Sequence, residues 1–426
     1  MIYSDPPLVL EADKITDALG TILVEDLPDV QPANPVRLEG TTPLMERLWR
    51  IALSDVESNI LETQGVRYLG AGKGFGHWIF LRDIAFSGVL GLNRVYPDLM
   101  RTSLEAARKA RHSMGFKVSR GYIIDGIDAD WQQTDVKEAE FFDKHLVGDY
   151  GRCSDDVVWL WCAEDLFNNN GTLENWKWLY EQGTKSFDVF YWPFYDESDG
   201  LFRGQASFVD VHFVDYKDTG YPHEMSISDC VMLKATSTNC LYVRGFEVMA
   251  RTAARLGLDE ESRQWASKAV VLKAALLREL RSADGTFVYY KDRHGALTER
   301  REALGTALAV VLGVVSGEEA VAACRGFPVS HAGVPLFLPF FDGEKCYHNN
   351  SAWPFVDTFF IQALEIGDGQ DRTALNAALL ARTCRDDGTF HELVDFRDGR
   401  IMGSSSQLWT AAAFVDTCIR GGLIEL

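Results

Sequence analysis

Residues 248–280 read VMARTAARLGLDEESRQWASKAVVLKAALLREL, and this stretch decides the fold class. Its apolar residues recur at three- and four-residue spacing, which is typical of amphipathic helices. Gly257 ends the first run, and the acidic residues from Asp259 onward begin the second, as expected for helix ends. The stretch therefore predicts two consecutive helices.

The same periodicity recurs along most of the 426 residues. Twelve helices are expected, near 43–63, 81–92, 97–114, 154–170, 172–189, 230–257, 259–281, 300–313, 317–325, 351–367, 370–384 and 405–422. Six helical hairpins would close a double ring of inner and outer helices. The expected fold is therefore all-α, an (α/α)6 toroid. Residues 43–426 would form one catalytic domain, and residues 1–42 an N-terminal extended arm.

Composition excludes several classes of partner. The formal net charge of −20 argues against nucleic acid and anionic membranes, because both need clustered Lys and Arg. The eight cysteines form no CxxC pair, as for thiols in a reducing compartment. The sequence has neither a signal-peptide pattern nor a long apolar run, so a cytoplasmic location is expected. The sequence leaves open whether the chain forms homo-oligomers.

Turn and loop signals interrupt the helices. Asp-Gly pairs favour tight turns because glycine tolerates positive φ. They occur, each followed by an aromatic residue two positions later, at residues 199–200, 284–285 and 387–388. Two long loops are expected over 115–153 and 190–229, and loops this long in a compact domain are usually functional.

Four clusters could carry chemistry. Glu392 follows a turn and precedes the string Gln407-Leu408-Trp409, although a surface glutamate or a helix cap is the simpler reading. Residues 347–355, YHNNSAWPF, combine an imidazole, amides and an indole, a mixture suited to sugars. In that cluster Ser351 could also be a plain helix cap beside a core Trp.

The other two clusters lie earlier in the chain. Arg82 and Asp83 follow a glycine-rich turn over 70–76, whose spacing does not fit a phosphate loop. The loop after residue 190 combines aromatic residues such as Trp192 with carboxylates that end at Asp210. Aromatic walls desolvate a carboxylate and raise its pKa, as a general acid requires.

Together the clusters resemble the six-hairpin glycosidase superfamily, in particular the amylo-α-1,6-glucosidase module of glycogen-debranching enzymes. There a DGL…TWMD segment carries the general acid, and residues 199–201 (DGL) with 207–210 (SFVD) match it in outline. A YHNGxxWPW segment lines the sugar site, and residues 347–355 match it with Asn350 in place of Gly. A late Glu followed by a Q-x-W-S-x-A helix start carries the general base, which matches Glu392 and residues 407–412.

The resemblance implies an inverting glycoside hydrolase that acts on a small, α-linked substrate, with Asp210 as acid and Glu392 as base. No β-sandwich module precedes the barrel segment here, which favours a small soluble substrate over a polymer. Asp199 and Asp196 are reserve acids. The carboxyl groups should lie roughly 6.5–9.5 Å apart, and neither a metal nor another cofactor is needed. The implied substrate-binding residues are Trp78, Arg82, Asp83, Asp156, Trp192, Tyr347, His348, Asn349, Trp353, Gln407 and Trp409.

Two alternatives remain open at this point. A sugar epimerase, isomerase or lyase on the same scaffold would use histidines, and His212, His223 and His348 could converge. A non-catalytic sugar-binding protein would not need the two carboxylates.

Overall fold

The computed structural model describes residues 8–63, 65–75, 78–114, 120–122, 157–210 and 220–424. Each of the twelve expected helices corresponds to a helix of the structure, and the ends differ by a few residues. The all-α fold class is therefore confirmed, with several very short sheets added to it.

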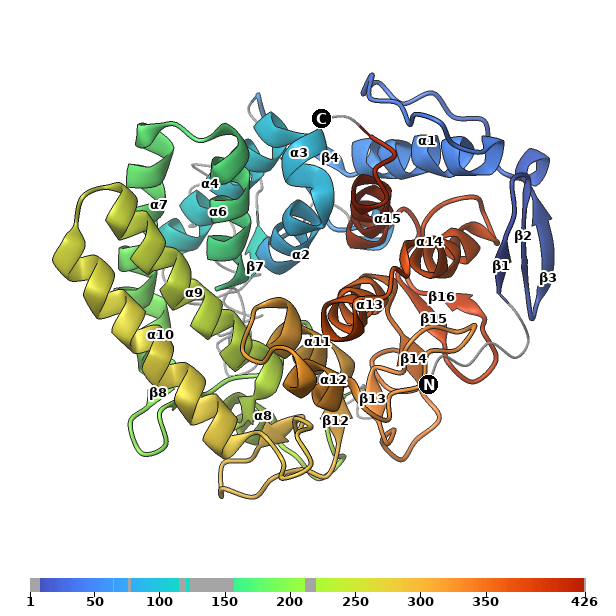
Figure 1. Ribbon diagram of the computed structural model, residues 1–426. Coiled ribbons are helices and arrows are strands. Elements are labelled where there is room, and N and C mark those ends of the chain that lie inside the picture. The colour runs from blue at the N-terminus through green and yellow to red at the C-terminus, as the bar shows by residue number, and fades with distance from the viewer. Residues whose placement is uncertain are drawn as a thin grey trace, which may run out of the picture.

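Six helices form an inner ring in which each packs against the next and the last packs against the first. In ring order they are α2 (Leu81–Ser87), α6 (Val158–Asn170), α9 (Thr236–Arg255), α11 (Ala303–Val311), α13 (Pro354–Asp368) and α15 (Leu408–Arg420). Figure 1 shows this ring with the outer helices around it. The outer helices are α4 (Pro97–Met114), α7 (Leu173–Ser186), α10 (Asp259–Glu279), α12 (Glu318–Cys324), α14 (Thr373–Ala381) and α1 (Pro43–Ser58). The sixth hairpin joins the two ends of the chain, because α1 packs on α15.

Burial separates the two rings as the sequence pattern requires. In the inner helix α11 every residue but the last is buried. A helix that is apolar all round must lie inside the protein. The outer helix α10 buries one stripe only, with Trp265, Ala269 and Leu272 at three- and four-residue spacing.

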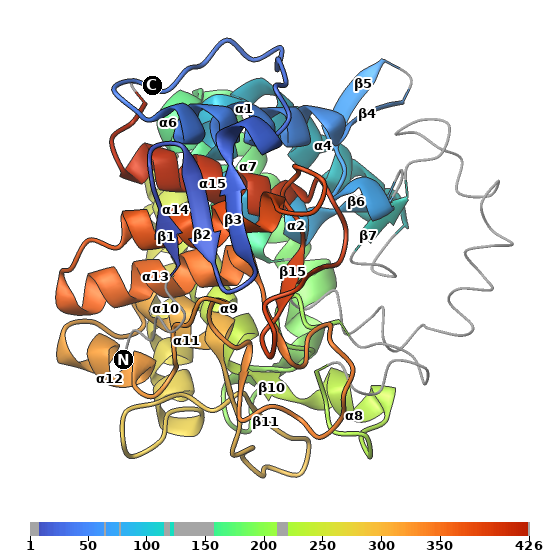
Figure 2. The same ribbon diagram turned by 90° about the vertical axis from the view of Figure 1, so that its right-hand side faces the viewer.

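Short antiparallel strand pairs bracket four of the helical hairpins. They are β6 (Trp78–Phe80) with β7 (Arg120–Tyr122), β10 (Lys234–Ala235) with β11 (Tyr290–Lys291), β12 (Arg301–Glu302) with β13 (Phe337–Leu338), and β14 (Ser351–Ala352) with β15 (Leu393–Asp395). The first strand of each pair leads into α2, α9, α11 or α13. A further strand, β16 (Ile401–Met402), pairs with β15. The segments that precede the inner helices therefore gather at one end of the ring, where β6, β7 and β15 lie in Figure 2.

The segment before α1 forms a three-stranded antiparallel sheet, which the sequence does not indicate. Its strands are β1 (Val9–Leu10), β2 (Lys14–Asp17) and β3 (Gly20–Leu23). The sheet lies against the outside of the ring near α14, and Arg385 donates to the Gly20 carbonyl at 3.1 Å. Two more hairpins are β4 (Ile60–Thr63) with β5 (Val66–Leu69), and β8 (Tyr195–Asp196) with β9 (Leu201–Phe202).

The three expected Asp-Gly turns are confirmed. Their glycines, Gly200, Gly285 and Gly388, have φ of 78°, 89° and 73°. In each turn the aspartate side chain accepts a hydrogen bond from the backbone N–H two residues later.

Two findings concern the described residues as a whole. Within them, no helix is both long enough and apolar enough to cross a membrane. Their seven cysteines are all free thiols.

Glu302 is a buried glutamate that directly precedes α11, and its ionisation can be tested. Its side chain is 1 % exposed, and burial raises its pKa to about 8. The folded state therefore prefers the protonated acid. The free energy of unfolding is therefore highest below the pKa that Glu302 has in the unfolded chain. It falls as the pH rises toward 8, because the unfolded chain then ionises Glu302 more readily than the folded protein does. Glu302→Gln should remove this loss, on the order of 3 kcal/mol, when urea unfolding is compared at pH 5 and pH 8.

The matched control is Glu318→Gln, which changes an exposed glutamate at the start of α12. It should leave the pH dependence of unfolding close to that of the wild type. An equal pH dependence in Glu302→Gln and the wild type would contradict the assignment.

Candidate active site

Five of the expected site residues come together at the strand-bearing end of the ring. Arg82 and Asp83 lie in the first turn of α2, and Glu392 directly precedes β15. Tyr347 lies shortly before β14, and Asp210 lies beyond β9. Segments far apart in the sequence therefore supply one cluster, defined here as the carboxylate cluster.

Asp210 forms an ion pair with Arg82. The Arg82 Nη1 atom lies 3.0 Å from Asp210 Oδ1, and Gln205 Nε2 also donates to Oδ1 at 3.4 Å. The side chain of Asp210 is 20 % exposed, which makes it more accessible than the other acids of the cluster. An adjacent guanidinium favours the charged form of a carboxylate.

Glu392 is buried, with 3 % of its surface exposed. Tyr347 Oη donates to its Oε1 at 3.2 Å, and the Ser404 N–H donates to its Oε2 at 2.8 Å. Burial raises the pKa of Glu392 to about 7, although both hydrogen bonds act to lower it. The Asp210 carboxylate raises it further, which places the two acids within electrostatic reach of each other.

Asp83 adds a third carboxyl group. Burial raises its pKa to about 7, Arg82 lowers it, and both Asp210 and Glu392 raise it. Burial also raises the pKa of Tyr347 well above its usual value, with smaller contributions from Glu392, Asp210 and Asp83. The cluster thus holds three acids, one guanidinium and one phenol, a set that can move protons and bind hydroxyl groups.

Aromatic side chains pack beside the cluster. Phe208 contacts His348, Trp353, Phe355 and Trp409 edge-on, with ring centroids 5.0–6.1 Å apart. His348 stacks on Trp353, and Phe355 stacks on Trp409 at 4.2 Å. These contacts join the segments that carry Asp210 and Tyr347 to the first turns of α13 and α15.

Three non-glycine residues with left-handed φ occur in the described chain, and all three lie in these segments. They are Phe208 (57°), Asn350 (55°) and Ser406 (47°). Asn350 stands where the resembling family has Gly, and asparagine tolerates this conformation better than most residues. Its side chain also donates to the carbonyls of Gly343 and Lys345. Left-handed residues of this kind cluster at functional sites.

Several expected sugar ligands have their polar groups committed to the protein. Both ends of the Asn349 amide bond the backbone of Phe341, at 3.0 and 2.9 Å, so its role here is to hold the loop. Trp353 Nε1 donates to the Tyr347 carbonyl and to Ser351 Oγ. The Gln407 side chain bridges the Ala71 carbonyl and Trp409 Nε1. These residues support the site rather than present free groups to it.

Trp192 is not brought to the cluster. It stacks on both Phe202 and Phe246, and Lys268 lies over its ring. Trp192 therefore packs against β9, α9 and α10, and its expected sugar-binding role stays a prediction. The backbone of Trp78 pairs with Tyr122 in β6 and β7, but its side chain lies outside what the structure describes, as does Asp156.

The two reserve acids are held in an ion-pair network. Lys234 Nζ lies 2.7 Å from Asp196 and 2.6 Å from Asp199, and Lys291 lies 2.9 Å from Asp199. Although burial opposes it, hydrogen bonds from Lys234 and Lys291 hold the pKa of Asp199 below its usual value. A general acid must hold a proton at working pH, so neither aspartate suits that role.

The histidine alternative does not gain support from the geometry. His223 is exposed and bonds the Asp342 carbonyl, His348 is buried among aromatic rings, and His212 lies outside the described residues. Across the described ranges, His, Cys, Asp and Glu side chains nowhere gather in threes to hold a metal ion.

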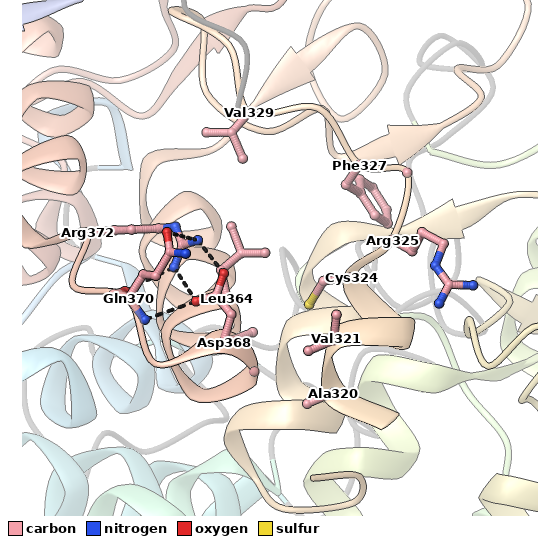
Figure 3. A pocket seen from close by; sticks show the side chains of 13 residues that line it. Ala320, Val321, Cys324, Arg325, Phe327, Val329, Leu364, Asp368, Gln370 and Arg372 are labelled. Atoms are coloured by element: carbon pink, nitrogen blue, oxygen red, sulfur yellow. Dashed lines mark hydrogen bonds and ion pairs between the residues drawn. The ribbon is translucent and has the colours of Figure 1, made fainter. Parts of the chain in front are cut away.

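A cavity of about 460 Å³ lies elsewhere, between α12 and the end of α13 (Figure 3). Cys324, Phe327 and Leu364 line it, and Arg372 pairs with Asp368 at its edge. None of its lining residues belongs to the carboxylate cluster.

Sequence reasoning missed Ser404, whose backbone N–H binds the carboxylate of Glu392. A backbone donor leaves no residue-type signal. It also missed the cationic partners of Asp199, because Lys234 and Lys291 reach it only through the pairing of β10 with β11.

The Lys234 network can be tested by its stability. Lys234 is buried, and removing it leaves two aspartates without their shared cation. Lys234→Met should lower the free energy of unfolding by about 3 kcal/mol in a urea titration. Arg263→Met breaks an exposed pair of similar length, 2.7 Å, and should have a far smaller effect, because solvent screens that pair. Equal effects of the two variants would refute a structural role for Lys234.

Comparisons with known proteins agree with this fold. The chain resembles the solved structure of a mannosylglycerate hydrolase from Thermus thermophilus in complex with glucose, with a TM-score of 0.61 and 15 % identity over 87 % of this chain and 99 % of that one. It also resembles a rhamnosidase from a Bacillus species, with a TM-score of 0.59 and 14 % identity over 92 % of this chain and 36 % of that one. A rhamnosidase from Klebsiella oxytoca with rhamnose bound gives a TM-score of 0.58 and 12 % identity, over 90 % of this chain and 65 % of that one. At such identities the likeness concerns the fold.

A sequence comparison with curated proteins finds no match. The family model described as the mannosylglycerate hydrolase MGH1-like glycoside hydrolase domain matches residues 172–410, which is more than half of the chain and includes Asp210 and Glu392. The chain therefore belongs to the MGH1-like glycoside hydrolases, a family of six-hairpin glycosidases.

Proposed function

We propose that this glycoside hydrolase inverts the anomeric configuration, with Asp210 as general acid and Glu392 as general base. One observation carries the proposal. Asp210 and Glu392 lie far apart in the sequence but within electrostatic reach of each other, beside Arg82, Asp83 and Tyr347. A pair of carboxyl groups is what an inverting glycosidase uses.

In the proposed reaction, protonated Asp210 gives its proton to the glycosidic oxygen as the bond to the anomeric carbon breaks. Water attacks that carbon from the opposite face, and ionised Glu392 takes a proton from the water. The cycle ends when Glu392 returns its proton to solvent and Asp210 regains one. No electron transfer is involved.

In the protein without substrate, Arg82 is paired with Asp210, and the proposed reaction requires this ion pair to open. Arg82 favours the charged form of Asp210, whereas burial raises the pKa of Glu392 to about 7. Arg82 therefore has to leave Asp210 as substrate binds. The Arg82 guanidinium can then donate hydrogen bonds to hydroxyl groups of the sugar instead, which agrees with the expected role of Arg82 and Asp83 at the sugar.

The proposed substrate is a small, α-linked glycoside. The family description and the Thermus thermophilus enzyme both refer to mannosylglycerate, a sugar joined to a small acid. The α linkage rests on the resemblance of residues 347–355 and 407–412 to the amylo-α-1,6-glucosidase module. The roles of Trp78 and Asp156 at the sugar stay predictions.

Substitution of the two carboxyl groups tests the roles. Glu392→Gln and Asp210→Asn should each lower kcat by about 10²–10⁴-fold, because each removes one proton transfer. The measurement is release of reducing sugar from a panel of α- and β-linked disaccharides and glycosyl glycerates. Asp199→Asn is the control, and it should keep wild-type kcat at a temperature where it remains folded. Full activity of both main variants would refute the assignment.

The stereochemical course is a separate test. Proton NMR of the first product, recorded before mutarotation, should show the anomer opposite to that of the substrate. The reason is that water attacks the face opposite the leaving group. Retention of configuration would refute the inverting mechanism but not the hydrolase activity.

A further inference from the structure

The two carboxylate oxygens of Glu392 are held from different parts of the chain. Oε1 accepts a hydrogen bond from Tyr347 Oη at 3.2 Å, and Oε2 accepts one from the Ser404 N–H at 2.8 Å. The Glu392 N–H in turn donates to the Ser404 carbonyl at 3.0 Å. The plane of the carboxylate is therefore fixed by two donors that are independent of each other.

The glycine-rich turn over residues 70–75 holds the Ser404 side of this arrangement. The Gly74 N–H donates to Ser404 Oγ at 2.9 Å, and the Lys73 N–H donates to the Ser405 carbonyl at 3.2 Å. A Cβ atom on Gly74 would lie 3.1 Å from Ser404 Oγ, and one on Gly72 would overlap the Gln407 side chain. The glycines thus permit a close approach of two backbones, which explains a motif that fits no phosphate loop.

Gly403 also permits a close approach, here of the backbone to the Glu392 carboxylate. Its φ is 81°, and a Cβ atom there would lie 2.5 Å from Glu392 Oε2. Glycine at this position lets the backbone pass directly over the carboxylate and present the next N–H to it.

We infer that Tyr347 and the glycine-rich turn act together as a clamp that fixes Glu392 in the orientation in which it takes a proton from water. The inference rests on the proposed role of Glu392 as general base. Tyr347 is then a positioning residue for the base, rather than only a wall of the sugar site. The turn over 70–75 positions the base through Ser404.

The groups around Glu392 determine the direction in which its pKa should change when the Tyr347 hydroxyl is removed. Asp210, Asp83 and Tyr347 face it, and Arg82 is paired with Asp210. The hydrogen bond from Tyr347 lowers the pKa of Glu392, against the larger effect of burial and the effect of Asp210. Loss of the phenol should therefore raise the pKa of the base. Because the base must be ionised, the acid limb of the kcat profile should then move to higher pH.

The experiment is the pH dependence of kcat and KM for Tyr347→Phe, measured with the substrate that the wild type hydrolyses best. The acid limb should move up by about one pH unit, because a hydrogen bond to a charged group is lost. The value of kcat at neutral pH should fall about tenfold while KM changes little. Tyr96→Phe is the matched control, because Tyr96 Oη donates to Glu57 Oε1 at the same 3.2 Å in another part of the fold.

Ser404→Ala tests the other arm of the clamp. It removes the Oγ atom that Gly74 binds but keeps the N–H that binds Glu392. It should lower kcat less than Tyr347→Phe does and should move the acid limb in the same direction. It also keeps the inference testable if one of the two variants fails to fold, which thermal melting would show.

The outcomes separate the two proposals. If Tyr347→Phe raises KM alone and both variants keep the wild-type kcat profile, the clamp is refuted and Tyr347 is a sugar ligand. If Glu392→Gln keeps full activity, the role of Glu392 as base fails, and the clamp fails with it. Loss of activity in Glu392→Gln together with an unmoved acid limb in Tyr347→Phe overturns the clamp alone.

Discussion

The fold depends on closure of the inner ring, in which α15 packs against both α13 and α2. Each inner helix from α2 to α13 is followed by an outer helix that returns the chain, so these inner helices run in one direction. Their N-terminal ends therefore share one end of the ring. A carboxylate placed just before or in the first turn of an inner helix reaches that end automatically, and helix N-termini favour negative charge.

This geometry explains why Arg82, Asp83 and Tyr347 of the carboxylate cluster lie where short strands lead into helices. β6 ends at the first turn of α2 with Arg82 and Asp83, and β14 precedes α13 after Tyr347. The Tyr347 hydroxyl reaches Glu392 near the pairing of β14 with β15, although the two lie in different helical hairpins. Three non-glycine residues in left-handed conformations mark the segments that meet there.

Much of the fold could be predicted from the sequence, because helix periodicity is a local signal. The run over 248–280 specifies α9 and α10 without any distant contact. The strands could not be predicted in this way. β10 and β11 have two residues each and exist because residue 234 meets residue 291 after a whole hairpin.

The same distinction between local signals and distant contacts applies to the residues of the site. Arg82, Asp83, Tyr347 and Glu392 could be found because their motifs are contiguous in the sequence. The contacts of Trp192 and Asn349 could not be predicted, because a half-buried, packed indole and a loop-bonding amide look the same in sequence as sugar ligands. Asp199 looked like an acid until Lys234 and Lys291 were placed beside it by distant segments. Residue type alone does not reveal which partners the fold supplies.

The split hairpin of α1 and α15 has a consequence for synthesis on the ribosome. The N-terminal helix emerges first, but its partner is the last inner helix to leave the exit tunnel. Glu392 leaves the tunnel shortly before α15, so a nascent chain that already carries both carboxylates still has no closed ring until α15 is released. Closure of the ring therefore waits for the end of translation of this domain.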